Sequence, residues 1–522
     1  MSYWSFYFLA KVVLHYRGYI GFHWLANLLL ALALLVPLPS RPLRVLRQVL
    51  AWPAALALLY YDSYLPSLER VLSQKQALSA FSLDYMAELL ARVWDWKIVL
   101  GLAALLALYG LLARRIRFST FALLGILSVP LAAALAPQPG VPMATAGRAA
   151  APGDAAAATL TTAADPQSQL QAFYASESTR RLDWGTAAAQ PGFDIIVLHV
   201  CSLSWDDLDF VGMRDHPLFK RFDAVFSQFN TAASYSGPAM LRILRGNCGQ
   251  PPHTALYEGA DPSCYVFPSL ERLGYQTQAL LNHDGHFDDF AKTLQGVGGL
   301  AGKLQPPDGA PVKMHSFDGT PIYGDLALLS RWWQGRQGAE QPAALYYNTI
   351  SLHDGNRVPG LASRRSLDTY KPRLTQLLAD FDQFITELES SGRPAVVLLV
   401  PEHGAALRGD KLQISGLREI PTPLITLAPA ALKVVGAPKA FTGTGGPLVV
   451  SQPTSYVGLN ALLGDLLHDS PFAPAARPLA ERMGQVQTTA YVAENGDMVM
   501  LRDAAGQYRM RTDKGVWIPY TP

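Results

Sequence analysis

Four long apolar stretches in the first quarter of the chain limit what this sequence can fold into. They cover residues 21–39, 45–61, 96–113 and 118–136, and none carries more than one charged side chain. Such stretches are about long enough, at roughly 17–20 residues, for a helix to cross a hydrocarbon layer. Charged residues make up only 16 % of the chain, which also favours a membrane protein. The sequence therefore predicts several transmembrane helices.

A fifth apolar stretch, residues 3–16, is shorter and carries Lys11 and His15. It either spans the membrane or lies along its surface. A cleavable signal peptide is disfavoured, because several apolar segments follow and no A-x-A site ends the first one. We therefore expect residues 1–136 to form a transmembrane domain of four or five helices.

The short loops between the predicted spans indicate the orientation. Two of these loops are rich in arginine, which the positive-inside rule places in the cytoplasm. Their arginines are Arg41, Arg44, Arg47, Arg114, Arg115 and Arg117. Everything beyond residue 136 then lies on the far side, which is the periplasm in a Gram-negative cell. The prediction is a multi-pass protein of the bacterial inner membrane with a periplasmic domain.

Charge and cysteine content narrow the function further. The 43 basic and 41 acidic residues nearly balance, so the chain lacks the basic face that a nucleic-acid-binding protein needs. Its three cysteines, Cys201, Cys248 and Cys264, all fall in the predicted exported part. An odd number leaves at least one unpaired or paired elsewhere, and the spacing would allow Cys248 and Cys264 to close a short loop as a disulfide.

Composition changes again after the last predicted span. Residues 137–190 are rich in Ala, Pro, Thr and Gly and contain few large apolar side chains. Such a segment buries too little apolar surface to offset the entropy of folding. We expect a flexible linker here, in preference to an Ala-rich helix.

From residue 191 to 522, short apolar runs alternate with helical patterns. The run 193–200 (FDIIVLHV) has the length of a buried strand, and residues 373–391 repeat leucine and phenylalanine at helical spacing. Further strands are predicted at 223–233, 275–283, 343–353, 394–403 and 421–429, and a further helix at 239–245. This alternation predicts an α/β domain with a mostly parallel sheet, and the alternating segment 489–520, with its Asn-Gly turn, predicts C-terminal antiparallel hairpins.

Polar residues follow several of these strands where each strand ends. Cys201 follows the first strand, His353 follows another, and Glu402 and His403 follow the very apolar run 394–401. In parallel sheets, functional residues gather just beyond the carboxyl ends of the strands. A thiolate, a carboxylate and an imidazole suit Zn²⁺, and three protein ligands leave a fourth position open for catalysis. The alternatives are a buried structural cysteine, an ordinary loop histidine and a polar strand end.

Ser236 lies in the segment SYSGPAMLRILRG, directly before a predicted helix. A hydroxyl at a helix N-terminus lies in the positive potential of unpaired amides, and metal ligation would make it a nucleophile. The plainer alternative is that Ser234 or Ser236 caps the helix. Both roles can coexist in one loop.

Taken together, these segments resemble the alkaline-phosphatase superfamily. The segments FDIIVLHVCSLSWDDLD, SYSGPAMLRILRGNCGQ, SLHDGN and VPEHGAALRGDKLQISGLREIPTP are similar, more specifically, to the phosphoethanolamine transferases of cellulose biosynthesis in Gram-negative bacteria. The resemblance covers nearly the whole chain. It implies an alkaline-phosphatase-like periplasmic α/β domain after the transmembrane helices.

The resemblance also assigns roles by position. It implies that Ser236 is the nucleophile and a zinc ligand, and that Cys201, Glu402 and His403 are the other zinc ligands. His353, Tyr235 and Arg418 would contact substrate or donate protons. A second zinc would need His353 together with His283 or Asp354. The resemblance also pairs Cys248 with Cys264.

The implied reaction moves phosphoethanolamine from phosphatidylethanolamine to glucose 6-hydroxyls of cellulose through a covalent serine intermediate. The implied partners are the membrane and the subunits of the cellulose synthase complex. A related transferase acting on lipid A or a glycerol phosphate acceptor is the nearest alternative. The non-enzymatic alternative is a mainly scaffolding subunit, in which polar residues such as His23 and Arg92 contact partner proteins. Without such partners, we expect these two residues to be solvated or at an interface.

Overall fold

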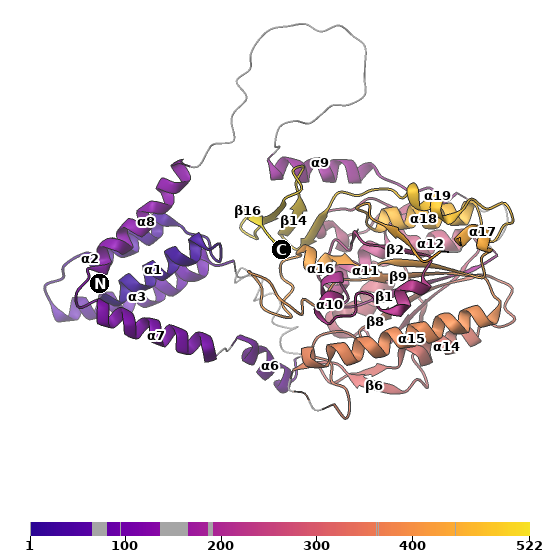
Figure 1. Cartoon of the computed structure of the whole chain (residues 1–522), viewed down its shortest axis with the longest axis horizontal. Coiled ribbons are helices and arrows are strands. Elements are labelled where there is room, and N and C mark those ends of the chain that lie inside the picture. The colour runs from indigo at the N-terminus through magenta and orange to yellow at the C-terminus, as the bar shows by residue number, and fades with distance from the viewer. Residues whose placement is uncertain are drawn as a thin grey trace, which may run out of the picture. The chain divides into compact units, whose positions relative to one another are not determined.

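The computed structural model describes most of the chain as two compact units. The described residues are 2–64, 81–93, 96–135, 165–185, 192–361, 363, 365–443 and 445–522. Five helices of the N-terminal part form the first unit, and α6 joins everything from α9 onward in the second (Figure 1). Helix α6 (Leu83–Val93) precedes the predicted boundary at residue 136, yet its residues up to Arg92 belong to the second unit.

The first unit is a bundle of apolar helices. The packed helices are α1 (Ser2–Tyr16), α2 (Trp24–Leu35), α3 (Arg41–Asp62) and α8 (Phe118–Leu135), and α7 (Trp96–Leu112) belongs to the same unit. Helix α1 packs along α8, with Phe8, Val12 and Ile126 in the core between them. Within the described ranges, α3 is the helix long and apolar enough to cross a membrane, while Trp24–Leu35, Val99–Leu112 and Phe118–Ala132 are shorter apolar helices.

The charged residue in the short stretch 3–16 has a buried partner. The ammonium of Lys11 lies 2.5 Å from Oδ2 of Asp62 at the end of α3, and it also donates to Asn27 at 2.8 Å. His23 contacts the same carboxylate at 2.6 Å. A buried charge is tolerated when it is paired and hydrogen-bonded. Helix α1 therefore packs inside the bundle despite its lysine.

The second unit is built on an eight-stranded sheet with the order β12-β2-β11-β9-β1-β8-β4-β5. The strands are β1 (Asp194–Val200), β2 (Ala224–Phe226), β4 (Gln276–Leu281), β5 (Leu304–Gln305), β8 (Ala343–Thr349), β9 (Ala395–Pro401), β11 (Ala431–Val435) and β12 (Leu448–Val450). Only the pairings that involve β11 are antiparallel. The predicted α/β domain with a mostly parallel sheet is confirmed.

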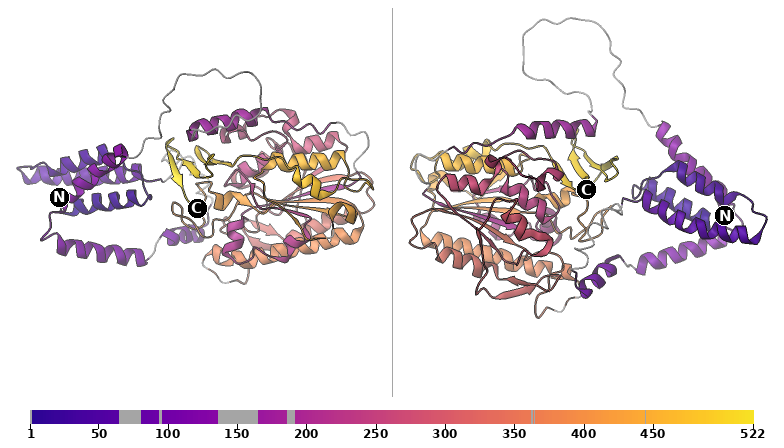
Figure 2. Two further views of the ribbon diagram at one scale, coloured as in Figure 1. Left: turned by 45° about the horizontal axis from the view of Figure 1, so that its top comes forward. Right: turned by 180° about the vertical axis from the view of Figure 1, so that it is seen from behind.

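Helices cover both faces of this sheet (Figures 1 and 2). Helices α14 (Asp325–Gln334) and α15 (Tyr370–Ser391) lie on one face, and α11 (Ser236–Leu244), α12 (Val266–Arg272) and α18 (Tyr456–His468) lie on the other. Alternate residues of β1 enter the two cores: Ile195 and Val197 pack with α11, α12 and α18, whereas Ile196 and Leu198 pack with α14 and α15. Burial on both faces explains why β1 and β9 read as continuous apolar runs.

Smaller elements complete the second unit. They are α10 (Trp205–Phe210), α13 (Phe290–Gln295), α17 (Lys439–Thr442), α19 (Leu479–Gly484), β3 (Phe229–Asn230) and the hairpin of β6 (Val312–His315) with β7 (Pro321–Tyr323). A four-stranded antiparallel sheet closes the chain, with β13 (Val492–Asn495), β14 (Met498–Arg502), β15 (Tyr508–Arg511) and β16 (Trp517–Tyr520) in sequence order. The predicted C-terminal hairpins are therefore confirmed.

The strand predicted at 421–429 is wrong over most of its length. The chain forms the short helix α16 (Pro423–Thr426) and only then the two-residue strand β10 (Leu427–Ala428). Proline is favoured at the first position of a helix, where its missing N–H is not needed. The strand that adds to the central sheet is β11, immediately downstream, which the sequence patterns did not single out.

The prediction of a flexible linker over 137–190 is wrong for residues 166–179, which form helix α9 (Pro166–Thr179). Asp165 caps this helix, and Leu170 and Phe173 pack against Val499 and Leu501 of the C-terminal sheet. These two apolar side chains lie three residues apart, on one helical face, and that face anchors the helix. Residues 136–164 and 186–191 lie outside the described part of the chain.

Candidate metal centre and nucleophile

The central strands β1 and β9 bring the predicted zinc ligands together. Val200 and Pro401 are paired at the ends of the two parallel strands, so Cys201 and Glu402 follow at the same level. The amide of Cys201 donates to the Thr349 carbonyl at 3.0 Å, and the amide of Glu402 donates to the Val200 carbonyl at 2.8 Å. The backbone on both sides of the cluster is therefore fixed by the sheet.

Four side chains meet at this edge of the sheet. Sγ of Cys201 lies 3.9 Å from Nε2 of His403, and Nε2 of His403 lies 3.7 Å from Oε2 of Glu402. Oγ of Ser236 lies 3.4 Å from both the Cys201 sulfur and the His403 nitrogen. In a tetrahedral zinc site with bonds of ~2.0–2.3 Å, neighbouring donors lie roughly 3.3–3.8 Å apart. The spacing of these side chains fits one such ion.

The hydrogen bonds of these side chains leave ligand atoms available for a cation. Oε2 of Glu402 is buried and has no hydrogen-bond partner among the described residues. Nδ1 of His403 lies 2.9 Å from the carbonyl oxygen of Gly404, to which it donates, and this leaves the Nε2 lone pair facing Cys201. Such a second hydrogen bond is the usual way in which a protein fixes the tautomer of a metal-binding histidine. A thiolate, an imidazole and a carboxylate together match the preferences of zinc.

Burial strongly affects the charge of this cluster. Cys201, Glu402 and His403 have essentially no exposed surface. Burial, assisted by the nearby Glu402, raises the pKa of the Cys201 thiol to about 12, and burial raises the pKa of Glu402 to about 7. Burial also lowers the pKa of His403 well below its usual value, so that this imidazole is neutral. A bound divalent cation would supply the positive charge that a buried thiolate and carboxylate need.

The candidate nucleophile Ser236 is the first residue of α11, where unpaired helix amides create a positive potential. The N-cap residue is Tyr235, whose side chain makes no capping hydrogen bond. The alternative that Ser234 or Ser236 caps this helix is therefore wrong. Oγ of Ser234 is buried without a hydrogen-bond partner among the described residues, whereas Oγ of Ser236 faces the cluster.

Other side chains orient Glu402, and the sequence patterns did not predict this role for any of them. Nδ2 of Asn348 donates to Oε1 of Glu402 at 2.5 Å, and Oδ1 of Asn348 accepts from Nε2 of His283 at 2.9 Å. Nδ1 of His199 lies 3.5 Å from the same Oε1 and 2.8 Å from the Tyr346 hydroxyl. These residues lie within or just after central strands, so their burial alone gives no functional signal in the sequence.

The glycine after His403 is required by close packing. A Cβ at Gly404 would lie 2.5 Å from Oγ of Ser204 and 2.8 Å from Oδ2 of Asp207. The same Asp207 carboxylate accepts the Ala405 amide at 2.6 Å and the Leu407 amide at 3.2 Å, which fixes the loop beyond the cluster. Burial raises the pKa of Asp207 to about 6. A strand that ends in Glu-His-Gly thus presents two donors and then turns against α10.

The ring of Tyr235 lies 6.5 Å from that of His403, and Arg418 and His353 lie near enough for their charges to act on His403. Cζ of Arg418 lies 5.4 Å from the Tyr235 ring centre, and the Tyr235 hydroxyl donates to Glu419 at 2.8 Å. Nε and Nη1 of Arg418 are buried without a hydrogen-bond partner in the described part of the chain. Burial first, and then the charge of Arg418, lower the pKa of His353 to about 4. A buried guanidinium with unused donors can bind an anion.

The residues considered for a second zinc have other partners. Both ring nitrogens of His283 are engaged, one with Asn348 and one with the Gly285 amide at 3.1 Å. Asp354 is paired with Arg92 at 2.6 Å. Across the described ranges, Cys201, Glu402 and His403 are the one cluster of three metal-ligating side chains. Cys248 and Cys264 form a disulfide, as the resemblance implies, which leaves Cys201 as the free thiol.

The fold and this site define a class of protein. It is an α/β protein in which a serine at the start of a helix lies beside a buried set of side chains that could bind one metal ion. Comparisons with known proteins specify the family. Residues 4–131 match the model for the "Cellulose biosynthesis protein BcsG N-terminal domain", and residues 150–517 match that for the "Cellulose biosynthesis protein BcsG C-terminal domain". The chain belongs to the BcsG family.

Individual relatives agree with this assignment. The chain is 36 % identical to the cellulose biosynthesis protein BcsG of Escherichia coli (strain K12), and 37 % identical to that of Salmonella typhimurium; both alignments cover 100 % of this chain and 96 % of the relative. Among solved structures, a protein in the alkaline phosphatase superfamily from Vibrio parahaemolyticus is similar with a TM-score of 0.46 and 12 % identity, over 69 % of this chain and 91 % of that one.

Proposed function

We propose that this protein is a zinc-dependent phosphoethanolamine transferase that modifies cellulose. The observation that carries the proposal is the position of Ser236, whose Oγ lies 3.4 Å from both Cys201 Sγ and His403 Nε2 at the N-terminus of α11. The membership in a family named for cellulose biosynthesis supports cellulose as the acceptor. The zinc ligands in this proposal are Cys201, Glu402, His403 and Ser236.

The reaction has two balanced steps. Oγ of Ser236 attacks the phosphorus of phosphatidylethanolamine; the bond from phosphorus to the diacylglycerol oxygen breaks, and that oxygen takes up a proton. A glucose 6-hydroxyl then attacks the phosphorus of the phosphoethanolamine-serine, the bond to Oγ breaks, and the serine regains a proton. A covalent intermediate divides one difficult transfer into two easier steps. When bound, zinc supplies Lewis acidity that lowers the pKa of an adjacent hydroxyl.

The other site residues act on charge and protons. Arg418 has two buried donor groups without partners, which would pair with phosphoryl oxygens as negative charge develops on them. Neutral His353 would accept or pass on a proton of the reacting hydroxyls. Tyr235 lies between α11 and Arg418 and would hold the guanidinium through its ring.

The proposed setting is the bacterial inner membrane, with the second unit in the periplasm. The long apolar helix α3 and the three shorter apolar helices support a multi-pass arrangement. Phosphatidylethanolamine in the outer leaflet would then be the donor. The nascent glucan and the cellulose synthase subunits would be the partners on the same side of the membrane.

The test is the Ser236→Ala variant, assayed as zinc-loaded full-length protein with phosphatidylethanolamine and cellulose. We expect loss of transfer, and loss of the adduct of roughly 123 Da that a trapped serine intermediate would carry. Ser234→Ala is the matched control, because it removes a hydroxyl two residues away that has no hydrogen-bond partner among the described residues. Retained transfer in Ser236→Ala would assign the nucleophile elsewhere. Modified lipid A in place of modified cellulose, found by mass spectrometry of cells, would change the acceptor.

A further inference from the structure

Helix α6 belongs to the catalytic unit, although it lies in the chain between α3 and α7 of the first unit. The amide of Ser82 donates to the Phe317 carbonyl at 3.3 Å, and the ring of Tyr85 lies 5.8 Å from the ring of Phe317. The ring of Phe317 in turn lies 5.2 Å from His353. Helix α6 therefore packs on the loop that carries a predicted active-site residue.

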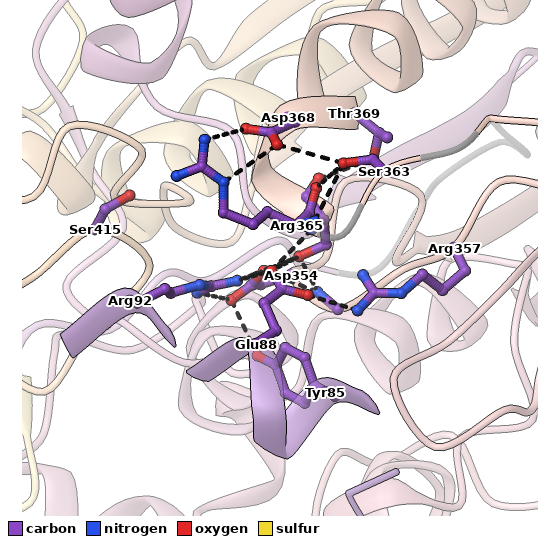
Figure 3. A network of polar contacts seen from close by, with 12 residues as sticks. Tyr85, Glu88, Arg92, Asp354, Arg357, Ser363, Arg365, Asp368, Thr369 and Ser415 are labelled. Atoms are coloured by element: carbon purple, nitrogen blue, oxygen red, sulfur yellow. Dashed lines mark hydrogen bonds and ion pairs between the residues drawn. The ribbon is translucent and has the colours of Figure 1, made fainter. Parts of the chain in front are cut away.

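The polar side of α6 binds Asp354, the residue after His353 (Figure 3). Arg92 donates through Nη1 to Oδ2 of Asp354 at 2.6 Å and through Nη2 to Oδ1 at 2.8 Å. The Tyr85 hydroxyl donates to the same Oδ2 at 3.0 Å, and Glu88 accepts from Arg92 at 2.5 Å. A planar guanidinium that binds both carboxylate oxygens is a strong, directional pairing.

This pairing is buried and sets the charge of Asp354. The side chains of Arg92 and Asp354 are only 6 % and 3 % exposed. Burial alone would raise the pKa of Asp354, but the hydrogen bonds and charge of Arg92 outweigh it, and the pKa lies below its usual value. Asp354 is therefore a buried carboxylate whose negative charge Arg92 balances.

The loop of a second guanidinium, that of Arg418, reaches the same carboxylate: a Cβ at Gly416, two residues before Arg418, would lie 3.2 Å from Oδ2 of Asp354. The charges of Arg418 and Asp354 stabilise each other, yet no hydrogen bond joins them. Nε and Nη1 of Arg418 have no partner among the described residues, whereas both oxygens of Asp354 are occupied. Arg373 also acts on this carboxylate, but its Nη1 and Nη2 already donate to the carbonyls of Ser351, His353 and Ser366. Arg92 therefore holds Asp354, and Arg418 is the neighbouring cation with unused donors.

Two glycines leave room for the α6 side chains. A Cβ at Gly416, two residues before Arg418, would lie 2.4 Å from Nη1 of Arg92. A Cβ at Gly355 would lie 3.1 Å from the ring of Tyr85. Arg92 thus lies against both loops that carry the outer site residues, the loop of His353 and the loop of Arg418.

We propose that Arg92 is a positioning residue for the active site: by occupying Asp354, it keeps Arg418 free to bind the phosphoryl oxygens of the donor. Without Arg92, the unpaired buried carboxylate of Asp354 draws Arg418 into a hydrogen-bonded pair and removes it from the anion-binding position. A buried charge without a partner is too costly to persist, so Arg418, a neighbouring cation with unused donors, replaces the lost one. This inference rests on the proposed function, because it concerns the same site.

The experiment measures the binding of inorganic phosphate to the zinc-loaded full chain in detergent by calorimetry. Arg92→Ala should weaken phosphate binding by about tenfold or more, the loss expected for one charge-assisted hydrogen-bonded contact, and should approach the Arg418→Ala variant. The double variant Arg92→Ala/Asp354→Asn should recover to within about threefold of the wild type, because no carboxylate remains to capture Arg418. In the transferase assay, the same order should appear in the KM for phosphatidylethanolamine.

The matched control is Arg357→Ala. Arg357 also binds α6, through Oε2 of Glu88 at 2.5 Å, but it makes no hydrogen bond to Asp354 in the described structure. Its loss weakens the attachment of α6 without changing the partner of Asp354, so phosphate binding should stay within about threefold of the wild type. Equal weakening in Arg357→Ala and Arg92→Ala would overturn the proposal, because it would mean that α6 acts only as a structural support.

Other outcomes separate the two proposals. Wild-type phosphate affinity in Arg92→Ala, or a double variant as weak as Arg92→Ala, contradicts the role of Arg92 and leaves the transferase proposal intact. In another outcome, the Arg92 variants change phosphate affinity as expected while Ser236→Ala still transfers phosphoethanolamine. That result contradicts only the proposed nucleophile. If Arg92→Ala does not fold, Arg92→Lys replaces it: one ammonium cannot occupy both carboxylate oxygens, so affinity should still fall and Asp354→Asn should still restore it.

Discussion

The sulfur of Cys201 lies 3.9 Å from Nε2 of His403, although 202 positions separate the two residues in the sequence. Adjacent parallel strands, β1 and β9, produce this approach, and the hydroxyl of Ser236 lies within 3.4 Å of both atoms.

Cys201→Ser should lower zinc affinity by about tenfold or more while the fold is retained, because a hydroxyl replaces the soft thiolate in a buried set of donors. Zinc content after dialysis against graded chelator, together with the circular dichroism spectrum, is the measurement. Stoichiometric zinc at wild-type affinity in this variant would show that the sulfur is not a ligand.

Asn348→Ala should weaken metal binding without removing a ligand. Asn348 is the donor that orients Glu402, and loss of such a contact typically lowers metal affinity by about 10–100-fold. Tyr347→Phe is the control, because it deletes a neighbouring hydrogen bond of the same strand, to Asp325. Equal zinc affinity in both variants would mean that Glu402 needs no support from Asn348.

Gly404→Ala should destabilise the second unit and weaken metal binding together, because the new methyl group would lie 2.5 Å from Ser204 and 2.8 Å from Asp207. Gly259→Ala is the control, since no atom lies within 4 Å of a Cβ at that position. Thermal unfolding and zinc titration are the measurements. An unchanged melting temperature in Gly404→Ala would show that the loop beyond His403 adapts freely.

Leu170→Ala should destabilise the protein by about 2–5 kcal/mol, the usual loss when a buried leucine is truncated. Leu170 is 1 % exposed and packs α9 against the C-terminal sheet, whereas Gln171, the control position, is exposed. Denaturant unfolding compares the two alanine variants. Equal stability would mean that α9 does not contribute to the folded unit.

The contribution of Asp354 to stability should depend on pH in a defined direction. Its pKa is lowered from 3.8 in the folded state, so this contribution is fully present above that value and is lost as pH falls through the lower folded pKa. The difference in unfolding free energy between wild type and Asp354→Asn should therefore stay constant from about pH 7 to about pH 5 and shrink only at lower pH. A difference that already disappears near neutral pH would contradict the strong pairing with Arg92.

Local sequence patterns predicted the sheet and the cluster well for a physical reason. Strands buried on both faces must be continuously apolar, so the polar residues that end β1 and β9 stand out, and parallel pairing brings them to one edge. The alternation of the last strands indicates a two-sided sheet in the same way, and it predicted β13 to β16.

The supporting residues could not be predicted from local patterns. Asn348 and His199 lie in the interior of apolar strands, and their partners come from strands distant in the sequence. The attachment of α9 depends on two apolar side chains in a segment of otherwise low hydropathy. The expectation that Arg92 is solvated is wrong, because its side chain is only 6 % exposed and pairs with Asp354. No local pattern could show this pairing, since the two residues are 262 positions apart. Contacts of this kind are set by tertiary packing, which no local pattern records.

Helix α6 has a practical consequence for work on the isolated second unit. A recombinant fragment that begins beyond α8 lacks Tyr85 and Arg92. It therefore lacks three hydrogen bonds to Asp354. The Asp354 carboxylate of such a fragment would pair with another cation. Measurements on the fragment would then describe this rearranged site. Adding residues 81–93 as a separate peptide would show how far the full chain differs from its truncated form.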